Sequence, residues 1–347
     1  MKYRIFISTV ALAAVTVGCS VAEPSGEPAS PINTVRVVTH DSFALPEELI
    51  ADFEDMTGYV VELSAPGDGG ALVNQLILTK DSPLGDVAYG IDNTFASRAL
   101  AQGVFSDYES PMVTVEVQEY AIGDSLALTP VDIGDVCFNV DHAWFEQAGI
   151  PEPVTFTDLT DPQYAGLTVV PNPATSSPGL AMLTATVGQF GTDGYAQFWQ
   201  DMRTNGVKVV SGWSDAYYVD FSGSEGQGDR PIVLSYSTSP AFEAADGVAR
   251  TGALLDTCFR QVEYAGVLAG AENVAGAEAF IDFLLSEQVQ SALPENMYVY
   301  PIIPSAELPA DWVEFAPLSD NPIAVPAEQI DAERDDWIET WTQVVID

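Results

Sequence analysis

Short β-branched runs alternate with helix-like segments over residues 35–105. The runs VRVVTH, YVVELSA and DVAYGI predict buried strands, because apolar and β-branched residues dominate each of them. Between them, residues 46–56 and the sequence ALVNQLILT repeat apolar residues every three or four positions, which predicts helices with one apolar face. Strands that alternate with helices form a mainly parallel sheet covered by helices, so the pattern predicts an α/β fold.

The same alternation continues toward the C-terminus. Further strands are predicted in GDVCFNVD (134–141), LTVVPNP, VKVV, RPIVLSY and CFRQVEYAGVLAG. Helices are predicted in SSPGLAMLTATVGQF, in GYAQFWQDMRTNG, over residues 275–293 and over residues 326–346, where Trp337 and Trp341 share one face. A chain of 347 residues has room for two domains of ordinary size.

Three polar turns follow predicted strands in the first region: HDS (40–42), DGG (68–70) and GIDN (90–93). In open α/β sheets, ligands bind outside the carboxyl ends of the strands. We therefore expect these turns to lie on one face of the protein, around a common crevice.

The first residues read as an export signal. Two basic residues precede the apolar run 5–17, which is too short to span a bilayer permanently, and a small residue then precedes Cys19. This ending is similar to the lipobox of bacterial lipoproteins, although Thr16 replaces the usual leucine. We expect residues 1–18 to be a signal peptide and Cys19 to be lipidated; plain cleavage is the alternative. Residues 19–34, rich in Ser, Pro, Gly and Glu, predict a flexible tether.

Charge restricts the partners of the protein. Eleven Lys and Arg residues stand against 51 Asp and Glu residues, a formal net charge of -40. Such a charge repels nucleic-acid phosphates and anionic membrane surfaces, so we expect no nucleic-acid partner and membrane contact only through a lipid. The acidity suits a solvated surface in salty surroundings; concentrating a cationic ligand is the alternative.

Cysteine usage leaves two possibilities. Apart from Cys19, the chain contains only Cys137 and Cys258. In an exported protein they can form a disulfide, or both can be buried free thiols.

Motifs for catalysis are missing. The chain has two histidines, His40 and His142, and lacks G-x-S-x-G, Walker, H-E-x-x-H, G-x-G-x-x-G and CxxC motifs. We therefore expect no catalytic residues, no cofactor and no metal, with a hydrolase that uses paired carboxylates as the alternative. Aromatic residues instead stand beside small polar turns, as in SGWSDAYY, SYSTSPAF and PENMYVYP. Aromatic faces in a cleft bind flat or cationic organic ligands.

Seven segments carry a resemblance to a known family. In chain order they are VTHDSF, APGDGGALVNQL, DVAYGIDNTF, NPATSSPGL, SGWSDAYY, VLSYSTSPAF and ALPENMYVYP. Together they resemble the thiamine-binding proteins of ABC importers, in the thiamine- and iron-binding branch of the type II solute-binding proteins. The resemblance extends from about residue 35 to the final helix.

The resemblance implies a two-lobed α/β fold in which each lobe has a mostly parallel sheet flanked by helices. It implies a first lobe of residues 35–130 and 262–347, with the final helix on either lobe, and a second lobe of residues 131–261. GDVCFNVD and CFRQVEYAGV would be two hinge crossings that lie side by side, which favours a bridge between Cys137 and Cys258.

The resemblance also implies a function. The protein would be a monomer in the periplasm or on the outer face of the membrane, and it would capture thiamine or a thiamine phosphate and deliver it to an ABC permease. Trp213 and Tyr236 would stack on the ligand, and Ser176 and Ser177 would offer hydroxyl and free N–H groups to its hydroxyethyl or phosphate end. The ligand-binding residues expected in this way are His40, Asp41, Asp68, Gly69, Gly70, Asp92, Ser176, Ser177, Trp213, Tyr236, Phe242 and Tyr298.

Three positions depart from the family pattern. His40 and Phe242 stand where the family usually has tyrosine, and Tyr298 stands where tryptophan is common. Each keeps a flat ring, but two hydroxyl groups are lost and a protonated His40 disfavours a cationic ligand. Another ligand on the same fold, such as ferric iron, a polyamine or a phosphonate, is therefore the main alternative.

Overall fold

One continuous sheet runs through the part of the chain that the structure describes, residues 33–224 and 228–347 of a computed structural model. The predicted signal peptide, Cys19 and nearly all of the predicted tether lie outside these residues. The main path of the sheet consists, in spatial order, of β2 (Val60–Ser64), β1 (Thr34–Thr39), β3 (Val87–Asp92), β10 (Phe259–Leu268), β5 (Thr129–Asp141), β8 (Ile232–Tyr236), β6 (Thr168–Pro171) and β7 (Lys208–Val210). Short strands extend it: β4 (Phe105–Ser106) pairs with β10, whereas β9 (Thr251–Ala253) and β11 (Tyr300–Pro301) pair with β5.

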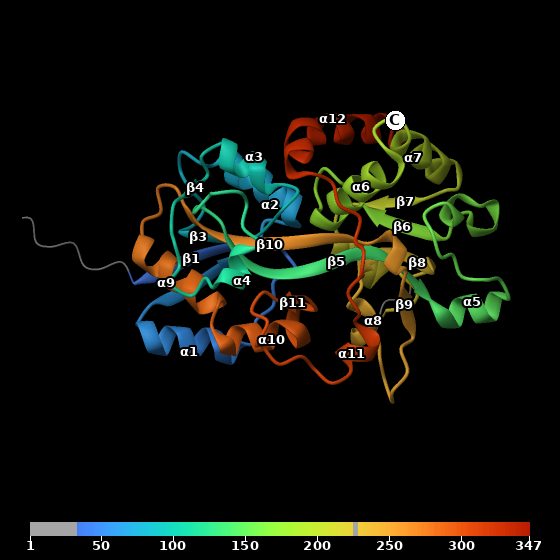
Figure 1. The fold of residues 1–347 in the computed structure, drawn as a ribbon. Helices are drawn as coiled ribbons and strands as arrows, with labels where there is room; N and C mark the ends of the chain where they lie inside the picture. The colour runs from blue at the N-terminus through green and yellow to red at the C-terminus, as the bar shows by residue number, and fades with distance from the viewer. Residues whose placement is uncertain (1–32, 225–227) are drawn as a thin grey trace, which may run out of the picture. The chain divides into compact units, whose positions relative to one another are not determined.

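The sheet has two parallel halves that two antiparallel strands connect. β2, β1 and β3 are parallel to one another, and so are β8, β6 and β7. The long strands β10 and β5 are antiparallel to each other and cross the middle of the protein (Figure 1). β10 pairs with β3 at one end, and β5 pairs with β8 at the other. The predicted lobe boundaries fall within these two strands.

A disulfide joins the two crossing strands. Cys137 of β5 is bonded to Cys258, the residue directly before β10, and both are fully buried. The bridge links positions 121 residues apart, which in the chain-entropy model stabilises the fold by about 4–5 kcal/mol.

Helices cover both faces of the first half of the sheet (Figure 1). One face carries α1 (Glu47–Thr57), α9 (Val274–Leu284) and α10 (Glu287–Met297), and the other carries α2 (Gly69–Leu78) and α3 (Ala96–Ala101). Phe53 of α1 packs edge-on against Phe280 of α9, with ring centroids 5.4 Å apart. The amphipathic patterns are therefore explained by burial against the sheet.

One helix predicted from the sequence is divided into two helices in the structure. The sequence pattern predicts a single helix over residues 275–293, but α9 ends at Leu284 and α10 begins at Glu287. The hydroxyl of Ser286 accepts a hydrogen bond from the backbone N–H of Val289 and so caps a new helix. Serine at this position ends the periodic run because its side chain satisfies an N–H that the first turn of a helix leaves unpaired.

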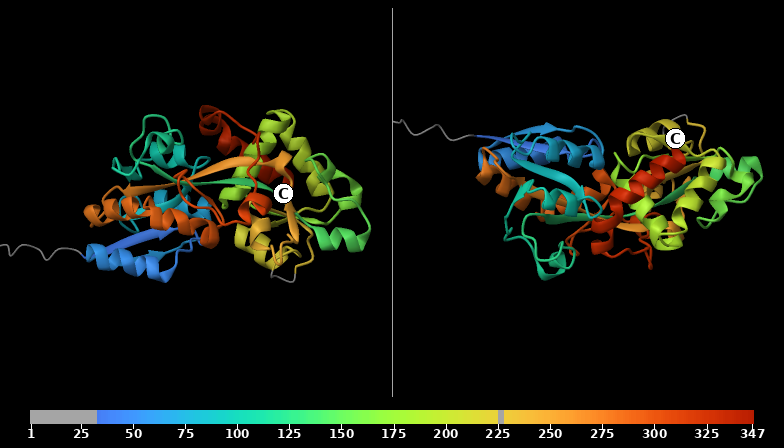
Figure 2. Two further views of the ribbon diagram at one scale, coloured as in Figure 1. Left: turned by 60° about the horizontal axis from the view of Figure 1, so that its bottom comes forward. Right: turned by 90° about the horizontal axis from the view of Figure 1, so that it is seen from above.

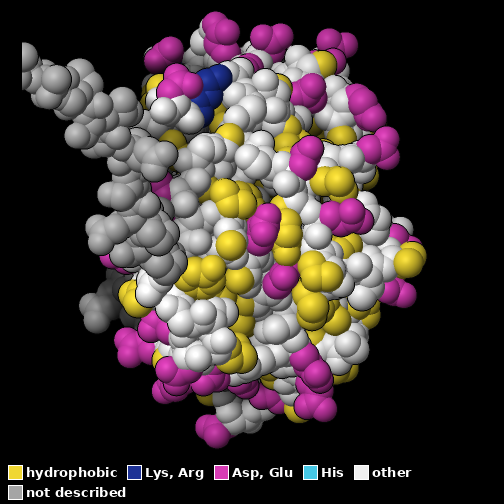
Figure 3. Space-filling view, turned by 90° about the vertical axis from the view of Figure 1, so that its left-hand side faces the viewer, with side chains coloured by type: hydrophobic (Ala, Val, Ile, Leu, Met, Phe, Trp, Pro, Cys, Tyr) yellow, Lys and Arg dark blue, Asp and Glu magenta, His cyan; other side chains and the backbone are white. Residues whose placement is uncertain are grey.

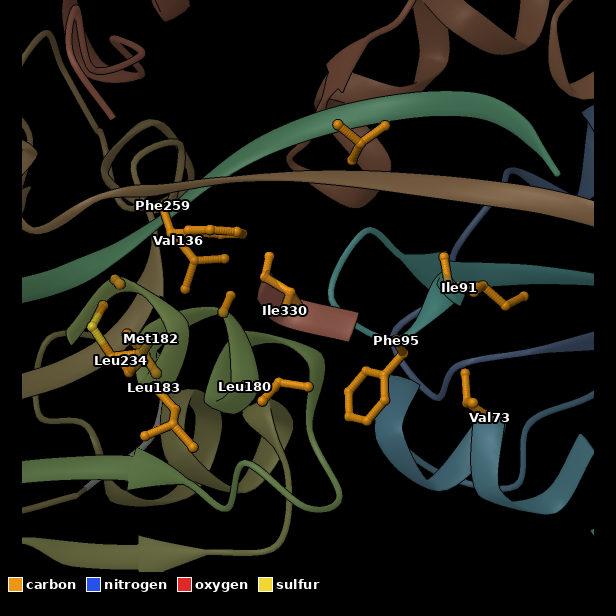
Figure 4. Close-up of a cluster of buried hydrophobic side chains, with 14 of the residues drawn as sticks. Val73, Ile91, Phe95, Val136, Leu180, Met182, Leu183, Leu234, Phe259 and Ile330 are labelled. Carbon is orange, nitrogen blue, oxygen red and sulfur yellow. The ribbon is translucent and has the colours of Figure 1, made fainter. Parts of the chain in front are cut away.

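The second half of the sheet is covered by α6 (Ser177–Phe190), α7 (Tyr195–Thr204) and the final helix α12 (Ala327–Val345). α12 packs on α6 and α7, as the view from above in Figure 2 shows. Trp337 and Trp341 are both buried, and the Trp341 ring meets that of Trp199 on α7 at 5.8 Å. Ile330 of α12 lies between buried side chains of the two halves of the sheet (Figure 4).

Short helices occur in the connections. They are α4 (Val115–Gln118), α5 (His142–Ala148), α8 (Ser239–Phe242), α11 (Trp312–Phe315), the 3₁₀ helices Asp158–Thr160, Pro162–Tyr164 and Leu255–Thr257, and a π-helix at Asp215–Asp220.

The surface is strongly acidic. Figure 3 shows Asp and Glu side chains around the outer face of the first half of the sheet, with few Lys or Arg side chains among them. Within the described ranges, no helix combines the length and the apolarity needed to cross a membrane.

Candidate ligand-binding site

A cavity lies between the two halves of the sheet, where the polar turns and the aromatic segments meet. It encloses about 930 Å³ of empty space, counting the part open to solvent. The lining residues are His40, Asp41, Ser42, Ala44, Asp68, Gly69, Ser177, Pro178, Trp213, Ser214, Tyr217, Tyr218, Tyr236, Ser239, Phe242, Glu263, Asn296, Met297, Tyr298 and Val299.

The cavity brings together most of the residues selected from the sequence. The selected residues that line it are His40, Asp41, Asp68, Gly69, Ser177, Trp213, Tyr236, Phe242 and Tyr298. Gly70, Asp92 and Ser176 are buried close to these residues but do not line the cavity. His142 is elsewhere, at the start of α5, where its Nδ1 lies 2.6 Å from Glu152 Oε1.

Aromatic rings form one wall of the cavity. Trp213 and Tyr217 are stacked, with ring centroids 5.1 Å apart and planes 15° apart, and Tyr236 approaches Trp213 at 6.2 Å. Phe242 and Tyr298, which also line the cavity, meet edge to face at 4.7 Å. The indole Nε1 of Trp213 donates a hydrogen bond to Ser235 Oγ at 2.8 Å, which fixes the orientation of the ring. Such a wall offers π-faces to a flat or cationic ligand.

Asp68 connects the two halves of the sheet. Its carboxylate caps α2 by accepting from its neighbour Gly69, and it also accepts from the backbone N–H groups of Ser177 at 3.0 Å and Trp213 at 2.9 Å. Ser177 is the first residue of α6, so a carboxylate of one half occupies the N-terminus of a helix of the other. Burial raises the pKa of Asp68, although these N–H donors oppose the rise.

This pairing changes the predicted role of the serines. We predicted that Ser176 and Ser177 offer free hydroxyl and N–H groups to a ligand. In the structure the Ser177 N–H donates to Asp68 and the Ser177 hydroxyl donates to Asp92, while the Ser176 hydroxyl caps α6. These groups are occupied because a helix N-terminus attracts the nearest carboxylate.

Gly69 and Gly70 allow this close approach. A Cβ atom on Gly69 would lie 2.0 Å from Ser177 Oγ, and one on Gly70 would lie 2.7 Å from the carbonyl carbon of Thr175. The DGG turn therefore serves the packing of α2 against the segment before α6, and Gly70 has this role without lining the cavity.

A group of buried polar side chains lies beneath the cavity. Glu263 of β10 is opposite Asp132 of β5, and the Tyr89 hydroxyl lies 2.5 Å from Asp132 Oδ2 and 3.1 Å from Glu263 Oε2. Burial, together with the charge of Glu263, raises the pKa of Asp132 well above its usual value. For Glu263, burial favours the neutral acid, but attraction to His40 together with hydrogen bonds from Tyr89 and Asp132 outweighs burial and lowers the pKa. Glu263 is therefore the charged member of the carboxyl pair.

His40 faces Glu263 across the end of β1. Its Nε2 lies 3.6 Å from Glu263 Oε1. Burial by itself lowers the pKa of His40, but the negative charges of Glu263, Asp68 and Asp41 outweigh it and raise the pKa above the usual value. The cavity thus contains a donor and an anionic acceptor side by side.

Sequence reasoning missed Glu263 and the tyrosines after Trp213. Glu263 is the only acid in the apolar run FRQVEYAGVL, and a charge inside a buried strand requires a partner, which is a usable signal. Tyr217 and Tyr218 belong to the SGWSDAYY motif, from which only the tryptophan was selected. Their position in the aromatic wall depends on the π-helix, which the pattern of hydrophobic residues does not predict.

Comparison with known proteins shows the family to which the chain belongs. Residues 82–321 match the family described as bacterial extracellular solute-binding protein, and since the match covers more than half of the chain, the chain belongs to this family. It is 29% identical over 325 residues to the thiamine-binding periplasmic protein of Escherichia coli K12, covering 91% of this chain and 94% of that one. It is 26% identical to the thiamine-binding periplasmic protein of Brucella suis biovar 1, covering 89% and 91%.

Solved structures share the fold. A periplasmic thiamin binding protein superimposes with a TM-score of 0.79 at 26% identity, covering 90% of this chain and 96% of that one. Iron-bound HitA from Pseudomonas aeruginosa superimposes with a TM-score of 0.71 at 18% identity, covering 90% and 99%. The predicted fold class, a type II periplasmic-binding-protein fold with two crossing strands, is confirmed.

Among the residues that the structure describes, no group of three or more His, Cys, Asp and Glu side chains is arranged to hold a metal ion.

Proposed function

We propose that this protein captures thiamine or a thiamine phosphate outside the cytoplasm and delivers it to an ABC permease. The observation that carries the proposal is a cavity with an aromatic wall and a buried carboxylate between two halves of one sheet. Relatives whose names state thiamine binding, aligned over about nine-tenths of the chain, support this choice of ligand.

The cavity suits the chemistry of thiamine. The thiazolium ring is flat and cationic, and an aromatic face contributes about 0.5–2 kcal/mol to holding such a cation. Trp213, supported by Tyr217, supplies that face. Glu263 adds a buried negative charge, which favours a cation over a neutral or anionic ligand.

Capture would use the two crossing strands as a hinge. In this proposal, the first lobe contains residues 35–130 and most of 262–326, the second contains residues 131–261, and α12 moves with the second lobe because it packs on α6 and α7. The ligand would contact both lobes and so favour the closed form. The protein would bind its ligand without turnover and act as a monomer.

We also propose a lipid anchor on Cys19 after export and removal of the signal peptide. Mass spectrometry of the mature N-terminal peptide tests this directly. A diacylglyceryl-modified Cys19 supports the anchor, and an unmodified N-terminus contradicts it.

A ligand panel tests the choice of ligand. Thermal unfolding should be measured with thiamine, thiamine monophosphate, ferric citrate, spermidine and a simple phosphonate. A ligand at 100 times its Kd stabilises the folded state by about 2.7 kcal/mol, so thiamine or its phosphate should raise Tm by several degrees. If ferric citrate, spermidine or the phosphonate raises Tm and the thiamine compounds do not, the proposal is wrong.

A further inference from the structure

Two polar groups at the base of the cavity are close but not bonded to each other. His40 lies in the turn after β1, and Glu263 lies on β10. Both are at least nine-tenths buried, with 9% and 5% of their surfaces exposed. The distance of 3.6 Å between His40 Nε2 and Glu263 Oε1 is too long for a normal hydrogen bond.

The hydrogen on His40 can be located. The backbone N–H of Ser42 donates to His40 Nδ1 at 3.1 Å, so in the neutral ring the proton is on Nε2. In the charged ring, Nε2 also carries a proton. Nε2 is therefore a donor in both states, and no hydrogen-bond partner for it exists among the described residues.

Glu263 leaves one oxygen facing this donor. Its Oε2 lies 3.1 Å from the Tyr89 hydroxyl, which also contacts Asp132. The Tyr89 hydroxyl has a single hydrogen, although it contacts both carboxyl groups. A neutral Asp132 can donate its own hydrogen to the Tyr89 oxygen, which leaves the Tyr89 hydrogen for Glu263 Oε2. Glu263 then remains ionised, with Oε1 on the side of His40 and the cavity.

A donor beside an acceptor selects a ligand with the opposite pattern. An aromatic ring nitrogen beside an amino group is such a pattern, and a 4-aminopyrimidine presents it along one edge. The thiazolium ring of thiamine has no N–H, and its charge is repelled by a protonated His40. The two ends of the ligand therefore differ in how well they fit this pair.

We infer that His40 and Glu263 together recognise the aminopyrimidine end of the ligand and set specificity for the amino group. Glu263 Oε1 accepts a hydrogen bond from the 4-amino group, and His40 Nε2 donates to the neighbouring ring nitrogen. The cationic ring then lies toward the aromatic wall around Trp213. This inference rests on the proposed function, because it assumes that thiamine occupies the cavity.

The test uses an analogue with the reversed pattern. In oxythiamine a carbonyl replaces the 4-amino group and the ring nitrogen carries a hydrogen, so both hydrogen bonds to the pair become mismatched. Calorimetric Kd values for thiamine and oxythiamine should be measured with the wild-type protein, Glu263→Gln and Glu48→Gln. Glu48 is exposed on α1 and does not line the cavity, so its substitution makes the same chemical change away from the pair.

The wild-type protein should prefer thiamine by roughly 100-fold or more, because sites that bind through buried hydrogen bonds reject mismatched ligands strongly. Glu263→Gln should reduce this preference at least about tenfold, since its amide can donate to the carbonyl. Glu48→Gln should leave both Kd values and their ratio unchanged. An equal ratio in wild type and Glu263→Gln overturns the inference.

His40→Ala provides a second variant in case Glu263→Gln does not fold. It removes the donor to the ring nitrogen and should also reduce the ratio; an unchanged ratio overturns the inference. The two failures can be told apart. If wild-type protein does not bind thiamine, the proposed function is wrong and the inference falls with it; if thiamine binds without discrimination against oxythiamine, only the inference is wrong.

Discussion

At the scale of the residue, the buried carboxylates differ in whether the protein itself provides a hydrogen-bonded cation for them. Arg260 donates to Asp135 from Nε at 2.7 Å and from Nη2 at 2.9 Å, and Arg36 donates to Asp86 from the same two nitrogens. Glu263, in contrast, faces His40 at a distance without a hydrogen bond between them. The first two charges are satisfied by the protein itself, whereas the third retains capacity for a ligand.

Asp86 gives a prediction for stability. It is almost fully buried and accepts from Arg36 and from the backbone N–H groups of Glu272 and Asn273. Burial raises its pKa, but these donors and Arg36 outweigh burial and lower the pKa below 3.8. Because Arg36 is partly exposed, we expect Asp86→Asn to cost only about 2 kcal/mol at pH 7.

The pH dependence has a definite sign. A carboxyl whose pKa is lowered by folding stabilises the protein above its unfolded pKa, and this contribution is lost as the pH falls through the folded pKa. The difference in unfolding free energy between wild type and Asp86→Asn should be full at pH 7 and shrink below about pH 3.8. Denaturant titrations at several pH values measure it, and a difference that stays constant down to pH 2.5 contradicts the assignment.

Trp213 gives a prediction for binding. Trp213→Ala removes the aromatic face and should weaken thiamine binding about 5- to 30-fold, which corresponds to roughly 1–2 kcal/mol. Trp213→Phe keeps a ring and should recover part of the loss. Wild-type affinity in Trp213→Ala, measured by calorimetry, would show that the ligand does not use this wall.

At the scale of the element, the beginning of α6 is the point where the two halves of the sheet meet. Asp68 contributes the carboxylate, Ser177 and Trp213 contribute N–H groups, and Ala71 donates to the carbonyl of Thr175 at 3.0 Å. These contacts lie within the protein itself and hold the two halves of the sheet together at this point.

Removal of the Asp68 carboxylate should favour the open form. Hydrogen bonds to a charged group contribute about 1.5–3 kcal/mol, so Asp68→Ala should shift the population toward open molecules and weaken ligand binding. Small-angle X-ray scattering of ligand-free protein should show a larger radius of gyration. Thr114→Ala, which removes the cap of α4 away from the cavity, is the control and should leave scattering unchanged. Identical scattering from Asp68→Ala and wild type would rule out this role.

Much of the order of strands and helices is predictable from hydrophobic periodicity. Particular residues show which features of the structure cannot be predicted in this way. Strands such as β1 and helices such as α12 follow the pattern because each buries a regular face. β5 begins at Thr129, before the predicted residue 134, because its early residues include Pro130 and Asp132, types that are depleted in strands. The motifs locate the aromatic wall. Glu263 can be recognised as the single acid of an apolar strand, but its position beside His40 required the structure.

At the scale of the whole molecule, two parallel half-sheets depend on two crossing strands, and the disulfide holds those strands together. We expect the Cys137→Ala, Cys258→Ala double variant to lose about 4 kcal/mol of unfolding free energy, because the unfolded chain is no longer constrained. Guanidinium titration of this variant and the oxidised wild type measures the loss. Equal midpoints would mean that the bridge does not stabilise the fold.

The central claim is that the cavity between the halves of the sheet binds thiamine, and calorimetric titration of residues 33–347 with thiamine tests it most directly. The titration should be run at low and high salt, because the net charge of -40 makes the folded state repel itself when screening is weak. We expect one thiamine to bind per chain with micromolar or tighter affinity. A folded sample that releases no heat of binding at either salt concentration would contradict it.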